Sequence, residues 1–284
     1  MQLCSSDTLS KICLTGLMKV LYIAQEIYPY LPESEISKIC RELPQATQEA
    51  GREIRTFMPR YGCVNERRNQ LHEVIRLSGM NLIIDDTDHQ LIIKVASLQA
   101  ARMQVYFIDN DEYFHRKAVV ADSEGNEFSD NDDRAIFFAR GVLETVRKLR
   151  WKPDIIHCHG WMSAVVPVFV KHAYNEDPFF SESKIIYSLY DNAYNVPFHA
   201  HFADKILMDG MEKSSVAEVS ENGSFENLNK LAIANSDGVV QGSPDILPEL
   251  VEYTKKTKKL FLPYQTAENY VLSCNQFYDE VLKG

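Results

Sequence analysis

The clearest hydrophobic pattern in the chain lies near its start, between Lys19 and Tyr61. Lys19–Ala24 is a short apolar run, which predicts a strand buried on both faces of a sheet. Apolar positions from Ile36 to Ala46 recur at helical spacing, and we place Pro32 at or next to the first turn of that helix. Glu53–Met58 alternates as a second strand. This order predicts a parallel βαβ unit whose first loop faces a ligand crevice.

The rest of the chain alternates between strand and helix patterns. The β-rich runs 81–86 and 90–98, separated by the turn-like 87–89, predict a hairpin. We expect further strands at 71–77, 103–108, 154–157, 184–189 and 238–241, and helices at 131–149, 161–170, 225–234, 244–253 and 267–282. The polar, Ser-rich segment 212–224 is expected to be mobile. The alternation indicates an α/β fold with a doubly wound, mostly parallel sheet, one Rossmann-like half, carrying a β-hairpin insertion.

The predicted elements are enough for one domain and too few for two, which agrees with a length of 284 residues. We expect residues 1–18 to be a disordered extension, because they lack the continuous apolar core of a signal peptide. Residues 19–284 are then expected to form a single domain closed by the helix at 267–282.

Charge and cysteine content narrow the class of partner. A net charge of −10 and a pI near 5.3 disfavour nucleic acid and anionic membranes as partners. No apolar run approaches the roughly 20 residues that cross a bilayer. Six scattered cysteines without CxxC spacing indicate free thiols in a reducing compartment. We therefore expect a cytoplasmic protein that binds neither nucleic acid nor membrane.

The segment Asp154–Met162 carries the most chemistry, because it places His157 and His159 at the carboxyl end of a strand, where side chains line the crevice. The alternative is that one of these histidines is a buried, hydrogen-bonded strand residue. Trp161 fits the core better than a sugar-stacking platform. No third ligand stands at a usable spacing from the two histidines, so we expect no metal, and we expect no cofactor.

The loop after the first strand is a poor phosphate site. Such a site needs glycines, exposed N–H groups and usually a cation. This chain offers Pro32, Glu33, Ser34 and Glu35 instead. Proline removes a donor, and the two carboxylates occupy the positive end of the helix, where they would repel a diphosphate.

Several ordered motifs resemble those of the bacterial glycogen synthases and plant starch synthases. The run AQEIYPYLPESEI, followed by LPQATQEAGREIRTFMPRYG, is similar to the opening of that family. The similarity continues in SDNDDR (129–134), DIIHCHGWMSAVVP (154–167), SLYDNAYN (188–195) and ANSDGVVQGSP (234–244), and covers roughly residues 19–250.

This resemblance implies a two-domain fold in which each half is a doubly wound sheet and substrates bind between the halves. The family transfers glucose from ADP-glucose to an α-1,4-glucan with retention, and its N-terminal half mainly contributes the acceptor side. The resemblance implies these substrate-binding residues: Glu26, Tyr28, His157, His159, Trp161, Asn192 and Tyr194.

The chain departs from the family pattern at its most characteristic positions. Pro32 stands at the family lysine of K-T-G-G-L, and Glu33, Ser34 and Glu35 stand at T-G-G. The segment 160–162 replaces D-W-H, with Gly160 in place of its aspartate and Met162 in place of its histidine. The second half of the family fold is also expected to be absent. We therefore name no catalytic residue.

The combined pattern predicts a one-domain relative that does not transfer glucose alone. It would bind an α-glucan or maltooligosaccharide, or pair with a protein on the face where the second domain docks in the family. One alternative is an active glycogen synthase, complete or as half of a split enzyme. Another alternative is a structural or regulatory interaction protein without a sugar ligand.

Overall fold

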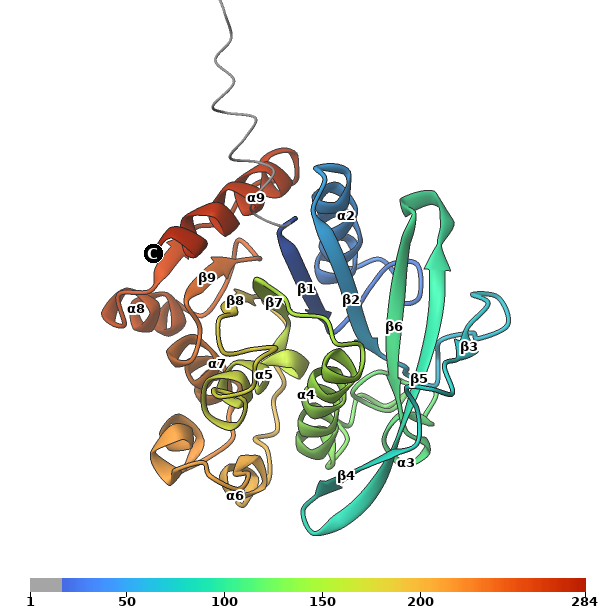
Figure 1. Cartoon of the computed structure of the whole chain (residues 1–284). Helices are drawn as coiled ribbons and strands as arrows, with labels where there is room; N and C mark the ends of the chain where they lie inside the picture. Colours follow the sequence, from blue (N-terminus) through green and yellow to red (C-terminus); the bar gives the residue numbers. More distant parts are fainter. Residues whose placement is uncertain (1–16) are drawn as a thin grey trace, which may run out of the picture.

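The computed structural model describes residues 17–284, which contain a ten-stranded sheet flanked by helices (Figure 1). The strand order is β10-β9-β8-β7-β1-β2-β6-β5-β3, and β4 pairs with β5. The strands are β1 (Lys19–Ala24), β2 (Glu53–Pro59), β3 (His72–Glu73), β4 (Met80–Ile84), β5 (Thr87–Leu98), β6 (Met103–Asp109), β7 (Ile155–His159), β8 (Lys184–Leu189), β9 (Gly238–Gln241) and β10 (Leu260–Leu262).

The sheet is parallel from β10 to β6, and only β3, β4 and β5 pair in antiparallel fashion. The predicted α/β fold with a mostly parallel sheet is therefore confirmed. Every residue of β7 is buried, as expected for a central strand covered on both faces.

Helices cover both faces of the sheet. Their bounds are α2 (Glu35–Glu49), α3 (Asp111–Phe114), α4 (Asn131–Lys148), α5 (Val166–Val168), α6 (Phe202–Ile206), α7 (Phe225–Ala234), α8 (Pro248–Lys256) and α9 (Ala267–Lys283). Helices α2 and α9 lie side by side, and Asp279 of α9 forms an ion pair of 3.0 Å with Arg52, which directly precedes β2. On the opposite face, α4 lies over β2 and β6, and α7 contacts β8 (Figure 1).

Helix α2 begins later than predicted. Ser34 is its N-cap, and the Ser34 hydroxyl accepts a hydrogen bond of 3.0 Å from Ser37 N while Ser37 Oγ accepts one of 2.7 Å from Ser34 N. Pro32 therefore lies in the loop shortly before the N-cap, next to the first turn and not within it. The reciprocal serine pair satisfies two backbone donors, so it sets the start of the helix.

The predicted hairpin is confirmed, but its turn lies elsewhere. Strands β4 and β5 are joined by Asp85 and Asp86, with φ of 46° and 64°, rather than by residues 87–89. A two-residue turn with both residues left-handed matches the twist of a hairpin, so Thr87 starts β5. The strand expected at 71–77 shrinks to β3.

Three further segments differ from expectation. The segment 212–224, expected to be mobile, contains a 3₁₀ helix, Lys213–Val219, that packs against α7 with Val216 and Val219 buried. The helix expected at 161–170 is broken into the 3₁₀ turn Trp161–Ser163, α5 and the π-helical turn Phe169–Ala173. The helix expected at 244–253 begins four residues later, as α8.

The disordered extension expected at residues 1–18 lies almost wholly outside the described residues and stays a prediction, as does the single domain at 19–284. Met18, the last residue of that range, accepts a hydrogen bond of 2.9 Å from Glu53 N through its carbonyl. Within residues 17–284, no helix combines the length and apolar character that a membrane crossing requires.

Candidate functional site

The candidate site lies where the order of the strands reverses, between β1 and β7. The chain passes from β1 to β2 on one side and returns later to β7 on the other. In open α/β sheets, ligands bind at the carboxyl ends of the strands at such a point. We use the word crevice for the region formed here by the loops that follow β1, β7 and β8. Here the two strand ends are joined by a hydrogen bond of 3.1 Å from Gln25 N to His159 O.

The Gln25 side chain connects three of the loops around this crevice. Its Oε1 atom accepts hydrogen bonds from Met162 N at 3.3 Å and from Asn192 Nδ2 at 3.4 Å. The Gln25 side chain is only 3% exposed, so these two hydrogen bonds take the place of the hydrogen bonds to water that its amide oxygen would otherwise accept. Sequence reasoning missed Gln25, and its only signal was its position directly after the first strand.

Gly160 lets the β7 loop approach Gln25 closely. Its φ of 79° and ψ of 160° fall in a region that is essentially restricted to glycine. A Cβ atom at this position would lie 2.8 Å from Gln25 Oε1. The close approach of the loop after β7 to the Gln25 side chain therefore requires glycine at position 160.

Substitution Gly160→Ala is expected to lower the free energy of unfolding by about 2–3 kcal/mol, because it adds backbone strain to a steric clash. Gly210→Ala is the matched control, since Gly210 has φ of 89° but nothing within 4 Å of the added Cβ. The control should lose only about 1 kcal/mol in urea unfolding. Equal losses in the two variants would show that the contact with Gln25 does not matter.

The start of α2 is occupied by carboxylates of the chain itself. Glu26 Oε2 accepts a hydrogen bond of 2.7 Å from Ser34 Oγ, and burial raises the pKa of Glu26. The Glu35 carboxylate accepts a hydrogen bond from Ser243, whose Oγ in turn accepts one of 3.2 Å from Asp191 N. The helix start is therefore tied to the loops after β8 and β9 through acidic groups.

The residues proposed from the sequence divide into two groups. Glu26, Tyr28 and Asn192 are half-buried and follow β1 and β8 at the crevice. The other four are buried: His157, His159, Trp161 and Tyr194. Among the positions that depart from the family pattern, Pro32, Glu33, Ser34 and Glu35 are exposed, and Gly160 and Met162 are buried.

Both histidines of β7 are buried and hydrogen-bonded to protein groups, His157 to α9 and β8 and His159 to the residue that follows β8. His157 Nδ1 lies 2.7 Å from the Tyr278 hydroxyl of α9, and its Nε2 lies 2.7 Å from Ser188 Oγ. His159 Nδ1 lies 2.8 Å from the Tyr190 hydroxyl. Burial lowers the pKa of His159 to about 3 and holds that of His157 well below its usual value. Both imidazoles are therefore neutral, and the buried state considered for one histidine applies to both.

Trp161 and Tyr194 belong to a buried aromatic cluster between the loops that follow β7 and β8. Trp161 is 2% exposed and packs edge-on against Tyr194 at 5.2 Å between ring centroids. The Tyr194 hydroxyl donates a hydrogen bond of 2.7 Å to Gly223 O. Packing in the core, which the sequence favoured for Trp161, is therefore observed.

Glu127 is a second residue near the crevice that sequence reasoning did not single out. Its carboxylate accepts hydrogen bonds from Asn195 N at 2.8 Å and Val196 N at 2.9 Å, which fixes the loop after β8. Within residues 17–284, no cluster of three or more His, Cys, Asp or Glu side chains is arranged to hold a metal ion.

Comparison with known proteins gives consistent matches. The family model described as starch synthase catalytic domain matches residues 19–260. A glycogen synthase of Chlorobium luteolum is 37% identical over 227 residues, which cover 77% of this chain and 44% of the relative. One of Chlorobaculum tepidum is 33% identical over 235 residues, which cover 82% of this chain and 47% of the relative. The chain thus spans about half the length of these curated relatives.

A solved structure shares the fold. It is the catalytic domain of starch synthase IV from Arabidopsis thaliana bound to ADP and acarbose, with a TM-score of 0.70 and 20% sequence identity. The match covers 88% of this chain and 51% of that one.

Proposed function

Because this chain belongs to the starch synthase catalytic-domain family, we propose that it acts as a glucan-binding half of a glucan synthase and transfers no glucose by itself. The family resemblance drawn from the sequence motifs is confirmed by the match over residues 19–260. A starch synthase of the same fold binds ADP and acarbose, which supports a sugar as the class of ligand.

The start of α2 is the observation that carries the proposal. A nucleotide sugar brings a diphosphate, which is stabilised by free N–H groups and cations at a helix start. Here the Ser34 side chain caps the helix, and the carboxylates of Glu26 and Glu35 lie beside it. Two negative charges in this position oppose a diphosphate but not a neutral glucan.

The half-buried residues suit a neutral sugar. The Asn192 amide and the Glu26 carboxyl group offer donors and acceptors to hydroxyl groups, and the Tyr28 ring offers an apolar face. We assign contact with the glucan to these three residues. His157, His159, Trp161 and Tyr194 are assigned the role of holding the crevice loops from behind, because their side chains are buried.

Isothermal titration tests this assignment. The chain is expected to bind maltoheptaose with a dissociation constant of about 0.1–1 mM, a range that corresponds to about 4–5.5 kcal/mol. ADP-glucose should show no binding, and incubation of both ligands with the chain should incorporate no glucose into glucan. Binding of ADP-glucose, or incorporation of glucose by the chain alone, would refute the proposal.

A matched pair of variants locates the site. Asn192→Ala is expected to weaken maltoheptaose binding by roughly tenfold, the effect of about one hydrogen bond. Asn81→Ala removes the same group from the exposed edge of β4 and should leave binding unchanged. If the two variants bind maltoheptaose with equal affinity, the glucan site does not include Asn192 and lies elsewhere on the molecule.

The remaining expectations form part of the same proposal. We propose that residues 19–284 fold as one domain in the cytoplasm, and that a protein partner carrying a donor-binding half docks over the crevice. Glucose incorporation that appears only when a second polypeptide is added would support it.

A further inference from the structure

A cavity of about 320 Å³ is lined in part by Pro29 and Tyr30 of the loop after β1. Its walls come from that loop, from α2, from the turn at residues 65–70 and from the end of β5. Polar and cationic side chains line much of it, among them Tyr30, Arg41, Arg68, Asn69, Gln70 and Gln99. No lining residue is acidic, although the chain as a whole carries a net charge of −10.

Two arginines on different elements line this cavity. Arg41 lies on α2, with its guanidinium 5.4 Å from the centroid of the Tyr28 ring. Arg68 lies in a turn that is capped by a hydrogen bond of 2.9 Å from Arg68 N to Asn65 Oδ1. Neither arginine forms an ion pair within residues 17–284. The acidic residue of the same turn, Glu66, is already paired with Lys94 at 2.7 Å.

Tyr30 forms part of the wall of the same cavity. Tyr30 is 6% exposed, and its ring packs edge-on against Phe107 at 4.8 Å between ring centroids. This packing fixes the loop after β1, which carries one wall of the cavity.

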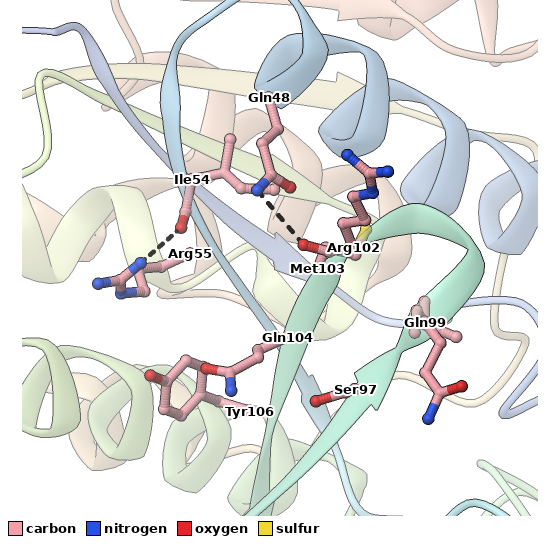
Figure 2. A pocket seen from close by; sticks show the side chains of 10 residues that line it. Gln48, Ile54, Arg55, Ser97, Gln99, Arg102, Met103, Gln104 and Tyr106 are labelled. Atoms are coloured by element: carbon pink, nitrogen blue, oxygen red, sulfur yellow. Dashed lines mark hydrogen bonds between the residues drawn. The ribbon is translucent and has the colours of Figure 1, made fainter.

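A second cavity, of about 420 Å³, shares Ser97, Leu98 and Gln99 with the first (Figure 2). It adds Arg102, which has φ of 51° and whose carbonyl accepts a hydrogen bond of 3.3 Å from Gln48. Its other arginine, Arg55, is paired with Glu53 at 3.3 Å and is therefore largely neutralised. The first cavity is thus the better site for an anion, and the second leaves room for a larger ligand.

We propose that the cavity between Arg41 and Arg68 binds a phosphate ester of a small polyhydroxylated molecule. Guanidinium groups match the oxygens of a phosphate in bidentate geometry. The amides of Asn69 and Gln99 both donate and accept hydrogen bonds, which suits hydroxyl groups next to the phosphate. The volume lies at the lower end of the range for small-molecule sites. The site adjoins the glucan contact assigned to Tyr28, because Arg41 lies over the Tyr28 ring, but it does not rest on the proposed glucan binding.

Titration of the full chain with glucose 1-phosphate, inorganic phosphate and glucose tests the proposal. Glucose 1-phosphate should bind saturably at millimolar concentration or below, phosphate should compete with it, and added salt should weaken both. Glucose should not bind in competition with phosphate. The proposal fails if glucose 1-phosphate does not bind, or if glucose displaces it equally well.

Variants connect binding to the cavity. The double variant Arg41→Gln, Arg68→Gln should lose about 100-fold in affinity, since hydrogen bonds to charged groups are worth about 1.5–3 kcal/mol each. Arg67→Gln is the control, because it removes the same charge from an exposed neighbouring residue outside the lining. Maltoheptaose binding should be unchanged in Arg67→Gln and in the single variant Arg68→Gln, which leaves the contact between Arg41 and Tyr28 in place. A folded double variant with unchanged phosphate affinity would overturn the proposal.

Discussion

Replacement of Arg134 by methionine is expected to lower the free energy of unfolding by about 3–5 kcal/mol. Arg134 is fully buried in α4, and burial lowers the pKa of its guanidinium to about 10, so it remains charged at neutral pH. The guanidinium donates to Tyr113 O at 2.9 Å, Asn131 Oδ1 at 2.6 Å and Val119 O at 2.7 Å. Methionine fills similar space but leaves Asn131 Oδ1 and Val119 O without a donor, whereas Tyr113 O keeps a hydrogen bond of 3.2 Å from Arg116.

Urea unfolding of three variants measures this effect. Arg147→Met removes an exposed arginine from the same helix, paired with Glu144 at 3.0 Å, and should cost at most about 1 kcal/mol. The free energy of unfolding of Arg134→Lys should lie between those of Arg134→Met and Arg147→Met, because one ammonium group cannot reach three separated acceptors. If Arg134→Met and Arg147→Met have equal free energies of unfolding, the Arg134 guanidinium does not hold the loop before α4.

Local sequence patterns correctly predicted the helices and strands whose ends carry a recognisable signal, such as an N-cap residue. Helix α7 was predicted at residues 225–234 and lies there, because Ser224 caps it by accepting a hydrogen bond of 3.2 Å from Asn227 N. Strands β8 and β9 also lie at their predicted positions. Strand β10 was missed, since it spans only three residues and directly follows a run of lysines.

The arrangement of the crevice was less accessible to sequence reasoning, because it depends on distant partners. The two-residue period of a strand places His157 and His159 on one face, but does not say which element covers that face. Tyr278, which contacts His157, lies 121 positions further along the chain. Gln25 likewise contacts Met162 and Asn192, which are 137 and 167 positions away. Local patterns carry no information on such pairs.

The pair of histidines on β7 is expected to make the fold sensitive to mild acid. Both imidazoles are neutral when folded, because burial lowers the pKa of His159 to about 3 and that of His157 well below its usual value. In the unfolded chain each pKa returns to about 6.5. The stability that comes from these neutral groups is complete above that pH and is lost as the pH falls toward the folded values. Two such groups correspond to a loss of about 3–4 kcal/mol between pH 7 and pH 5.

The pH dependence of urea unfolding, rather than stability at one pH, isolates this effect. His159→Gln removes one titrating group, so between pH 6 and pH 5 its slope should be smaller than that of the unmodified chain by about 1.2 kcal/mol per pH unit. This difference in slope is independent of any constant loss from repacking against Tyr190. His201→Gln is the control, because the His201 side chain is 77% exposed and remains in water on folding. If the free energy of unfolding of His159→Gln has the same pH dependence as that of the unmodified chain, His159 is protonated in the folded state. His159 then does not cause the expected loss of stability in acid.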